Sequence, residues 1–365
     1  MNQSTTQAQP DDKEHRRFRF IDGLRGLAAL LVTGFHFYNA GPLHQALSTL
    51  FPLPIGLILE QGWLGVEVFF VISGFVIAYS LRETKITLNF LRSFTLRRFL
   101  RLSPPYWGSI LLVILINYFS NWFLTDRAVP LPTVGVTLAH LFYLQNILGM
   151  GDLVPVFWTL CLEIQFYLVF VILLAISQNL IPQKSASFNM LTDFCFVGLA
   201  IGSIFLTIEA GSSIRSFFYP DWYTFFMGVL VCWTLQKKTL SIWLWLYVSI
   251  ITISLIIHWD IRIFATLITG LSIYLFVQYE QLQNWLNSRW QQYVGKISYS
   301  LYLIHLLTGM RIINLGYRVT GDSPILALVW FILAIAMSIL SAHLFYTWVE
   351  KPSLILSRKI KFENS

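Results

Sequence analysis

The chain has little charge for its length. Of its 365 residues only 12% are charged, whereas 56% are hydrophobic and 16% are aromatic. A soluble domain carries about 25% charged residues, so this chain has too little charge to cover a surface that faces water. The shortage excludes a soluble multidomain protein and a disordered tail protein. We therefore expect an all-α integral membrane protein that is dissolved mostly in lipid.

Cysteine is scarce as well. The three cysteines, Cys161, Cys195 and Cys232, lie inside apolar stretches and do not have the spacing of metal ligands. An odd and scattered set gives no disulfide framework, which excludes a secreted disulfide scaffold. No metal site is expected, and we interpret the cysteines as small buried hydrophobic residues.

Long apolar segments fill most of the sequence. At roughly 20 residues per span, it predicts ten transmembrane helices, at 21–40, 62–81, 104–123, 157–176, 191–209, 217–236, 239–257, 262–279, 297–317 and 324–348. Because residues 1–20 are polar and no apolar stretch precedes them, we expect a cytoplasmic tail there and not a signal peptide. A membrane domain over 21–350 and a basic cytoplasmic tail over 351–365 complete the predicted organisation, with both termini cytoplasmic.

The formal net charge of +7 is explained by membrane topology. In the ten-helix topology twenty of the 25 lysines and arginines are cytoplasmic, and the other five lie outside or in the outer half: Arg127, Arg215, Arg262, Arg311 and Arg318. This is a strong positive-inside bias, so no nucleic-acid partner is expected. The same topology makes 82–103 a cytoplasmic loop. It makes 124–156 an outer segment that folds as a lid or as a partly re-entrant cap.

Ionisable residues inside the predicted spans are few and mark candidate chemistry. His36, Glu67 and Glu163 each lie about four to six residues from the predicted outer end of a span, so at about 1.5 Å per residue they share one depth. We expect them to converge on a polar pocket, where a carboxylate fixes the tautomer of the imidazole for general-base work. The alternative is three separate polar anchors between helices.

Three arginines are candidates for anion binding. Arg25 and His36 are eleven residues apart, which places them within about 20° of one helical face and about 16–17 Å apart. Such a face suits a long ligand with an anionic head and a reactive end, although an arginine that anchors the helix end is an equal alternative. Arg98 and Arg101 share a face at i, i+3 and suit phosphates, or else the head groups of anionic lipids. His305 is interpreted as lining the donor channel or as core packing.

Six segments in this order resemble the motifs of one family: FRFIDGLRGLAALLVTGFHFY (18–38), GWLGVEVFFVISGFVIA (62–78), RRFLRLSPPYW (97–107), FWTLCLEIQFY (157–167), ISYSLYLIH (297–305) and VEKP (349–352). The chain resembles the acyltransferase-3 family of integral membrane acyltransferases, which modify sugars at the bacterial envelope. The resemblance covers nearly the whole chain after residue 18. One departure is Thr159, which stands where the family usually has serine.

The resemblance implies acyl transfer at the bacterial cytoplasmic membrane. The donor would be a cytoplasmic acyl-CoA, usually acetyl-CoA, used as a co-substrate with no permanently bound cofactor. The acceptor would be a hydroxyl of a carbohydrate, either free or lipid-linked. In this scheme the phosphates of CoA are held by Arg25, Arg98 and Arg101, with His305 beside the donor.

The expected chemistry centres on His36 as general base, with Glu67 or Glu163 orienting it. Ser73, Tyr302 or a backbone amide would stabilise the oxyanion. An acyl-histidine intermediate is the variant mechanism.

Two other classes of function stay open at this level. A secondary transporter or flippase also has buried ionisable groups, although paired broken helices in matching halves are not found. A membrane scaffold or sensor would tolerate replacement of His36. The family's frequent C-terminal SGNH-type domain has no counterpart here, so the expectation is a stand-alone member. The acceptor, the length of the acyl group and the oligomeric state are not predicted.

Overall fold

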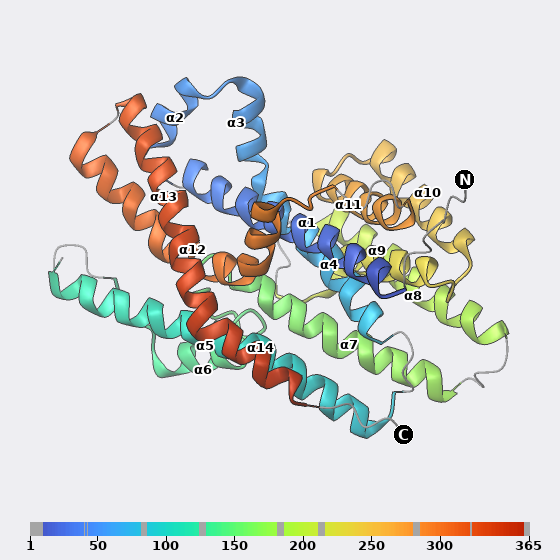
Figure 1. Cartoon of the computed structure of the whole chain (residues 1–365). Coiled ribbons are helices and arrows are strands. Elements are labelled where there is room, and N and C mark those ends of the chain that lie inside the picture. Colours follow the sequence, from blue (N-terminus) through green and yellow to red (C-terminus); the bar gives the residue numbers. More distant parts are fainter. Residues whose placement is uncertain are drawn as a thin grey trace, which may run out of the picture.

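The computed structural model describes residues 10–39, 41, 43–81, 86–123, 129–180, 186–210, 216–279, 285–321 and 323–360. These residues form helices joined by turns (Figure 1), which confirms the all-α class for the described part of the chain. The elements are α1 (Pro10–Asn39), α2 (His44–Leu50), α3 (Leu53–Glu60), η1 (Gly62–Leu64), α4 (Gly65–Ser80), α5 (Leu88–Phe123), α6 (Val134–Leu141), α7 (Trp158–Leu180), α8 (Ala186–Ala210), η4 (Tyr219–Asp221), α9 (Trp222–Leu235), α10 (Ser241–Ile257), α11 (Ile261–Gln278), α12 (Arg289–Thr320), α13 (Pro324–Phe345), η6 (Tyr346–Glu350) and α14 (Lys351–Arg358).

Every apolar segment predicted to span the membrane coincides with a helix. In the described residues, seven stretches are long and apolar enough to cross a membrane: Arg19–Asn39, Gly62–Ser80, Leu88–Trp122, Trp158–Asn179, Leu191–Glu209, Ile261–Gln278 and Pro324–Arg358. The other three predicted spans fall on α9 with 14 residues, on α10 with 17, and on α12, whose 32 residues include several cations. A membrane protein with seven candidate spans is therefore what the structure supports directly.

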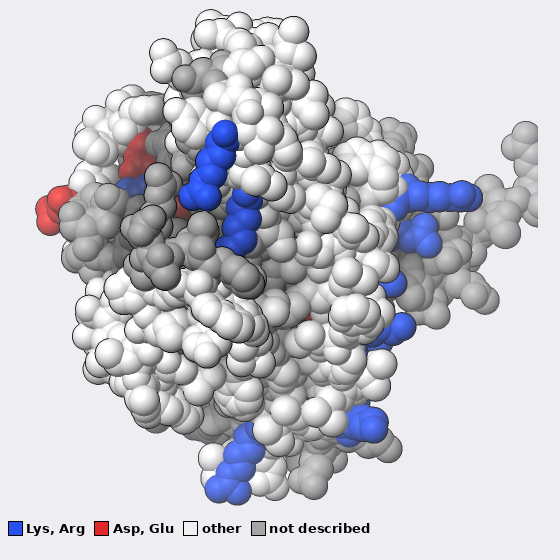
Figure 2. Space-filling model, turned by 90° about the vertical axis from the view of Figure 1, so that its left-hand side faces the viewer, with Lys and Arg blue, Asp and Glu red and all other residues white. Residues whose placement is uncertain are grey.

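The surface is apolar where a soluble protein would be charged. Large hydrophobic side chains stand fully outward, among them Leu53 at 74% exposure, Ile256 at 79% and Ile257 at 80%. Figure 2 shows one face of the molecule, which is uncharged over most of its area. Because water does not solvate such a surface favourably, this face is suited to lipid.

Close helix approaches set the positions of the site residues. α1 packs along α12, and the contact leaves no room for a side chain at Gly295, where a Cβ would lie 2.0 Å from the backbone oxygen of Asp22. α4 packs against α9 in the same way, since a Cβ at Gly74 would lie 1.8 Å from the oxygen of Phe225. Small residues allow this backbone contact between helices in a membrane.

The prediction that 82–103 is a loop is wrong from Leu88 onward, because α5 begins at Leu88 and continues through Pro104 and Pro105 to Phe123. The arginines of this stretch indicated a loop by their charge. Arginine is nevertheless a good helix former, and the i, i+3 spacing of Arg98 and Arg101 is helical. The residues from 10 to 20, predicted as a tail, likewise belong to α1.

The described part of the segment predicted as a lid or cap, residues 129–156, folds back along α5. Trp107 Nε1 donates to the oxygen of Leu141 at 3.0 Å, and the Tyr143 hydroxyl donates to Ser103 Oγ at 3.1 Å. Ser103 and Trp107 lie near the middle of the 36-residue helix α5, so the segment returns deep along that helix before α7 begins at Trp158. Residues 141–143 are thereby fixed against the middle of α5.

Candidate functional site

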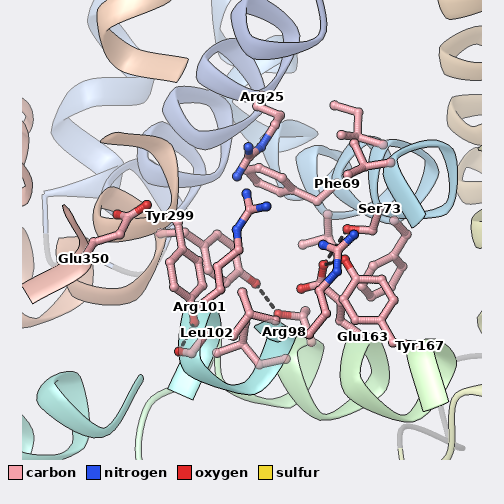
Figure 3. Close-up of a pocket in the computed structure, with 17 residues that line it drawn as sticks. Arg25, Phe69, Ser73, Arg98, Arg101, Leu102, Glu163, Tyr167, Tyr299 and Glu350 are labelled. Atoms are coloured by element: carbon pink, nitrogen blue, oxygen red, sulfur yellow. Dashed lines mark hydrogen bonds between the residues drawn. The ribbon is translucent and has the colours of Figure 1, made fainter. Parts of the chain in front are cut away.

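The central feature is a cavity of about 840 Å³ between α1, α4, α5, α7, α12 and η6 (Figure 3). Its walls mix aromatic, aliphatic and charged side chains, namely Arg25, Val66, Phe69, Phe70, Ile72, Ser73, Val76, Arg98, Arg101, Leu102, Thr159, Leu160, Glu163, Tyr167, Tyr299, Tyr302 and Glu350. Six of the nine predicted site residues are in this set. Elements far apart in the sequence therefore build one site.

The cavity contains more positive than negative charge. Arg25 enters from α1, and Arg98 and Arg101 enter from α5, with the three guanidinium groups directed into the same space (Figure 3). Only two lining residues are carboxylates, Glu163 and Glu350. Guanidinium groups bind phosphate through several directed hydrogen bonds, so the lining fits an anionic ligand such as a nucleotide phosphate. Among the described residues no cluster of three or more His, Cys, Asp or Glu side chains is arranged to hold a metal ion.

Glu163 is held by two hydroxyl groups. Ser73 Oγ donates to Glu163 Oε1 at 2.5 Å, and the Tyr167 hydroxyl donates to the same oxygen. Arg98 lies over the Tyr167 ring at 5.0 Å and donates from Nη2 to Ser80 Oγ at 3.3 Å. Because the proton of Ser73 is engaged with Glu163, this hydroxyl is not a free donor for an oxyanion.

Tyr302 forms one end of the cavity. Its hydroxyl lies 2.8 Å from Thr159 Oγ1 and donates to the Val156 oxygen at 3.3 Å. The ring packs edge-on against Phe69 with centroids 5.5 Å apart, and it also faces His305 at 6.2 Å. Tyr302 therefore separates the arginine-lined cavity from the histidines.

His36 and His305 form a direct pair beyond this wall. His305 Nε2 lies 3.2 Å from His36 Nδ1, and the ring centroids are 5.1 Å apart. His305 is completely buried, whereas His36 is half-buried. Neither histidine lines the cavity of Figure 3. The side chain that contacts the predicted base His36 directly thus comes from a residue 269 positions away in the sequence.

The hydrogen bonds of this pair assign its tautomers. His305 Nδ1 lies 3.0 Å from the Leu301 oxygen and 2.9 Å from the Tyr302 oxygen. Carbonyl oxygens only accept, so Nδ1 carries the proton and Nε2 is an acceptor. His36 Nδ1 lies 2.8 Å from the Val32 oxygen and faces the His305 acceptor. By the same logic His36 carries its proton on Nδ1, which leaves the lone pair of Nε2 available.

The two predicted carboxylates do not join His36. Glu67 is buried and accepts a hydrogen bond from Thr224 Oγ1 at 3.2 Å, on the side of α4 that faces α9. Ser73, six residues further along α4, lines the cavity, because six helical steps of about 100° turn it roughly 120° away from Glu67. In the described residues the hydrogen bonds of His36 go to Val32 and His305. The structure therefore gives His36, Glu67 and Glu163 three different surroundings.

Glu350 is a site residue that the sequence analysis missed. It ends the π-helical turn η6, is buried, and accepts hydrogen bonds from Ser300 N at 3.1 Å and Ser300 Oγ at 2.5 Å. It interacts electrostatically with Arg25 and Arg101 across the cavity. The sequence does contain an indication of this role, since Glu350 lies in the VEKP segment at the end of the last predicted span. An ionisable residue at that position is usually functional.

Comparison with known proteins gives one consistent result. The family model described as an acyltransferase domain matches residues 18–347. A provisionally named O-acetyltransferase of Staphylococcus aureus (strain COL) is 26% identical over 93% of this chain, and the O-acetyltransferase OatA of S. aureus (strain NCTC 8325 / PS 47) is 26% identical over 94%. The chain covers 58% and 59% of the length of these two relatives. No solved structure gives a significant match. The resemblance seen in the motifs is confirmed, and the chain belongs to the acyltransferase-3 family.

Proposed function

We propose that this chain is an O-acyltransferase of the bacterial cytoplasmic membrane that transfers an acyl group, in the simplest case acetyl, from a cytoplasmic acyl-CoA to a hydroxyl of an envelope carbohydrate. The family match supports the acyltransferase activity, and the names of the relatives support O-acetyl transfer. The positive-inside bias of the sequence supports ten spans with both termini cytoplasmic.

The donor site is the arginine-lined cavity. Arg25 and Arg101 bind phosphates of acyl-CoA, and Glu350 lies across from both and keeps their guanidinium groups directed into the cavity. Arg25 and His36 lie on one face of α1, about 16–17 Å apart. A pantetheine arm bound along this face carries the thioester from the arginines toward His36. Tyr302 and Phe69 stand between the two regions, so their side chains move or flank the arm when the donor is bound.

His36 Nε2 acts as the general base. It takes the proton of the sugar hydroxyl while that oxygen attacks the thioester carbonyl carbon, so a C–O bond forms as the hydroxyl O–H bond breaks. The C–S bond then breaks, and the CoA thiolate leaves and takes the proton back from His36 Nε2. The products are the sugar ester and free CoA thiol. A backbone amide is the stronger oxyanion candidate, because the hydroxyl protons of Ser73 and Tyr302 are directed to protein acceptors.

The observation that carries this proposal is the pairing of His36 with His305, in a chain of this family, next to a cavity lined by three arginines. A base needs an available lone pair, and a CoA donor needs a cationic site at pantetheine length from it. On α1, His36 provides the lone pair and Arg25 provides a cation at this distance.

Transfer of label tests the function. Purified full-length protein in nanodiscs is incubated with acetyl-labelled acetyl-CoA and an envelope glycan fraction. We expect label to move to an alkali-labile ester on the glycan, with release of one CoA thiol per ester. Movement of unmodified glycan across the bilayer with no ester formed would instead identify a transporter.

Substitution of His305 tests the orienting role of this residue. His305→Ala removes the acceptor for the Nδ1 proton of His36, so kcat should fall about three- to tenfold, the effect of one hydrogen bond, while KM for acetyl-CoA stays unchanged. His305→Gln places an amide oxygen near the lost Nε2 and should recover part of kcat. Equal loss in both variants, or a change confined to KM, contradicts the role and points to packing.

A further inference from the structure

An apolar groove opens from the side of the cavity between α5 and α7. A space of about 650 Å³ is lined by Leu91, Phe94, Thr95, Arg98, Phe99, Phe142, Tyr143, Ile164, Tyr167, Leu168 and Val171. It shares Arg98 and Tyr167 with the arginine-lined cavity. A further space of about 550 Å³ shares Leu91 with it and continues along Ile172, Ala175, Ile176 and Asn179. The groove therefore borders the proposed donor site at Arg98 and Tyr167.

The α7 wall of the groove is a single helical stripe. Its members lie alternately three residues and one residue apart: Ile164, Tyr167, Leu168, Val171, Ile172, Ala175, Ile176 and Asn179. This is the spacing of one helix face, and its fifteen steps extend over about 22 Å. α5 faces it with Leu91, Phe94, Thr95, Arg98 and Phe99, again one face. The two helices run beside each other in Figure 1.

The lining fits a hydrocarbon chain with a phosphate at its end. Along the α7 stripe only Tyr167 and Asn179 are polar, so the part of the groove between these two residues suits a hydrocarbon chain. Arg98 stands where the groove meets the cavity. In the described part of the chain Arg98 contacts Ser80 and the rings of Phe94 and Tyr167, and no carboxylate forms an ion pair with it. A cation that is not held in an ion pair beside an apolar groove complements an anionic lipid.

The polar groups beyond Arg98 continue the pattern. Glu163, Ser73 and Tyr167 lie in the cavity next to Arg98 and offer oxygen partners for sugar hydroxyls. From the groove inward the order is thus apolar wall, cation, then hydroxyl and carboxylate groups. A sugar carried on a lipid phosphate has the same order of hydrocarbon, phosphate and sugar.

We infer that the acyl acceptor is a sugar attached to a polyprenyl phosphate, whose chain occupies the groove between α5 and α7 and whose phosphate binds Arg98. Arg98 then belongs to the acceptor, while Arg25 and Arg101, which line only the cavity, stay with the donor. This inference rests on the proposed function and names its substrate class. The reaction that supplies the acceptor must be one that attaches a sugar to a lipid phosphate.

Binding of a polyprenyl phosphate tests the inference without any need for turnover. Full-length protein in phosphatidylcholine nanodiscs is titrated with a polyprenyl phosphate, with the matching polyprenol and with phosphatidylglycerol. Thr95→Trp and Ala175→Trp fill the groove and should each weaken binding of the polyprenyl phosphate about tenfold or more, as should Arg98→Gln. The matched control is Leu96→Trp, which adds the same side chain at a neighbouring, half-exposed residue of α5 outside the groove.

The outcomes separate the inference from the proposed function. The inference would be overturned if Thr95→Trp and Ala175→Trp bound the polyprenyl phosphate as tightly as wild type does. It would also be overturned if polyprenol and phosphatidylglycerol bound wild type as tightly as the polyprenyl phosphate does. Either result would identify the groove as a site for ordinary membrane lipid. Acetyl transfer to a sugar on a polyprenyl phosphate at the same rate in wild type and Thr95→Trp would also overturn it, with the proposed function intact. Absence of any acetyl transfer, with selective polyprenyl phosphate binding retained, would count against the proposed function alone.

Discussion

His36→Ala should reduce acetyl transfer by about two to four orders of magnitude, the usual contribution of a general base. The side chain is half-buried and its ring makes one side-chain hydrogen bond, to His305, so its removal leaves the packing of α1 on α12 largely in place. The loss should appear in kcat, because Arg25 and Arg101 still bind the donor. The measurement is ester formation with labelled acetyl-CoA, together with a binding isotherm for CoA.

The matched control is His343→Ala. His343 lies on α13, is exposed, and contacts the ring of Tyr293 at 5.9 Å. This variant makes the same chemical change and should keep wild-type kcat. Wild-type turnover in His36→Ala, with the protein folded, would remove His36 from the mechanism.

Arg101→Gln should raise KM for acetyl-CoA by about ten- to a hundredfold, since hydrogen bonds to a charged group contribute about 1.5–3 kcal/mol. Arg101 faces Arg25 and Glu350 in the cavity, and its charge is the part of the site that recognises phosphate. The effect on kcat should be smaller, because the reacting atoms lie toward His36. Steady-state kinetics with varied acetyl-CoA give both constants.

Two comparisons make this prediction specific. Acetyl-pantetheine has none of the nucleotide phosphates of CoA, so its KM should be nearly the same in wild type and Arg101→Gln. Arg92→Gln neutralises an exposed arginine of the same helix outside the cavity and should leave both substrates unaffected. An equal rise in KM for acetyl-pantetheine would show that Arg101 supports the fold and does not bind phosphate.

Local hydropathy was sufficient to predict the long apolar helices, but not the short helices α2, α3 and α6. Each of the ten apolar segments lies on a helix, because the length of an apolar run depends only on neighbouring residues. The start of α5 is not predicted, because the charges of Arg92 and Arg97 favour a loop by hydropathy although the helix begins at Leu88. The return of residues 129–156 along α5 depends on contacts such as Tyr143 with Ser103, which hydropathy does not contain.

The arrangement of the site was predicted less completely. The shared cavity of Arg25, Arg98 and Arg101 agrees with their expected grouping, but the convergence of His36 with two carboxylates depended on the rotation of each helix. The depth of a residue along a helix follows from counting residues, whereas the direction of its side chain around the helix axis depends on how the helices pack. Glu67, for example, faces α9. The contact of His305 with His36 has no local signal, because the two residues meet only through the packing of α1 on α12.

An experimental structure of the protein with a non-reactive thioether analogue of acetyl-CoA is the most direct test of the account. We predict phosphate oxygens within hydrogen-bond distance of Arg25 and Arg101, a pantetheine arm that runs along α1 past Tyr302, and the thioether sulfur next to His36 Nε2. Phosphates bound away from these arginines, or an arm that leaves the cavity without approaching His36, would contradict it.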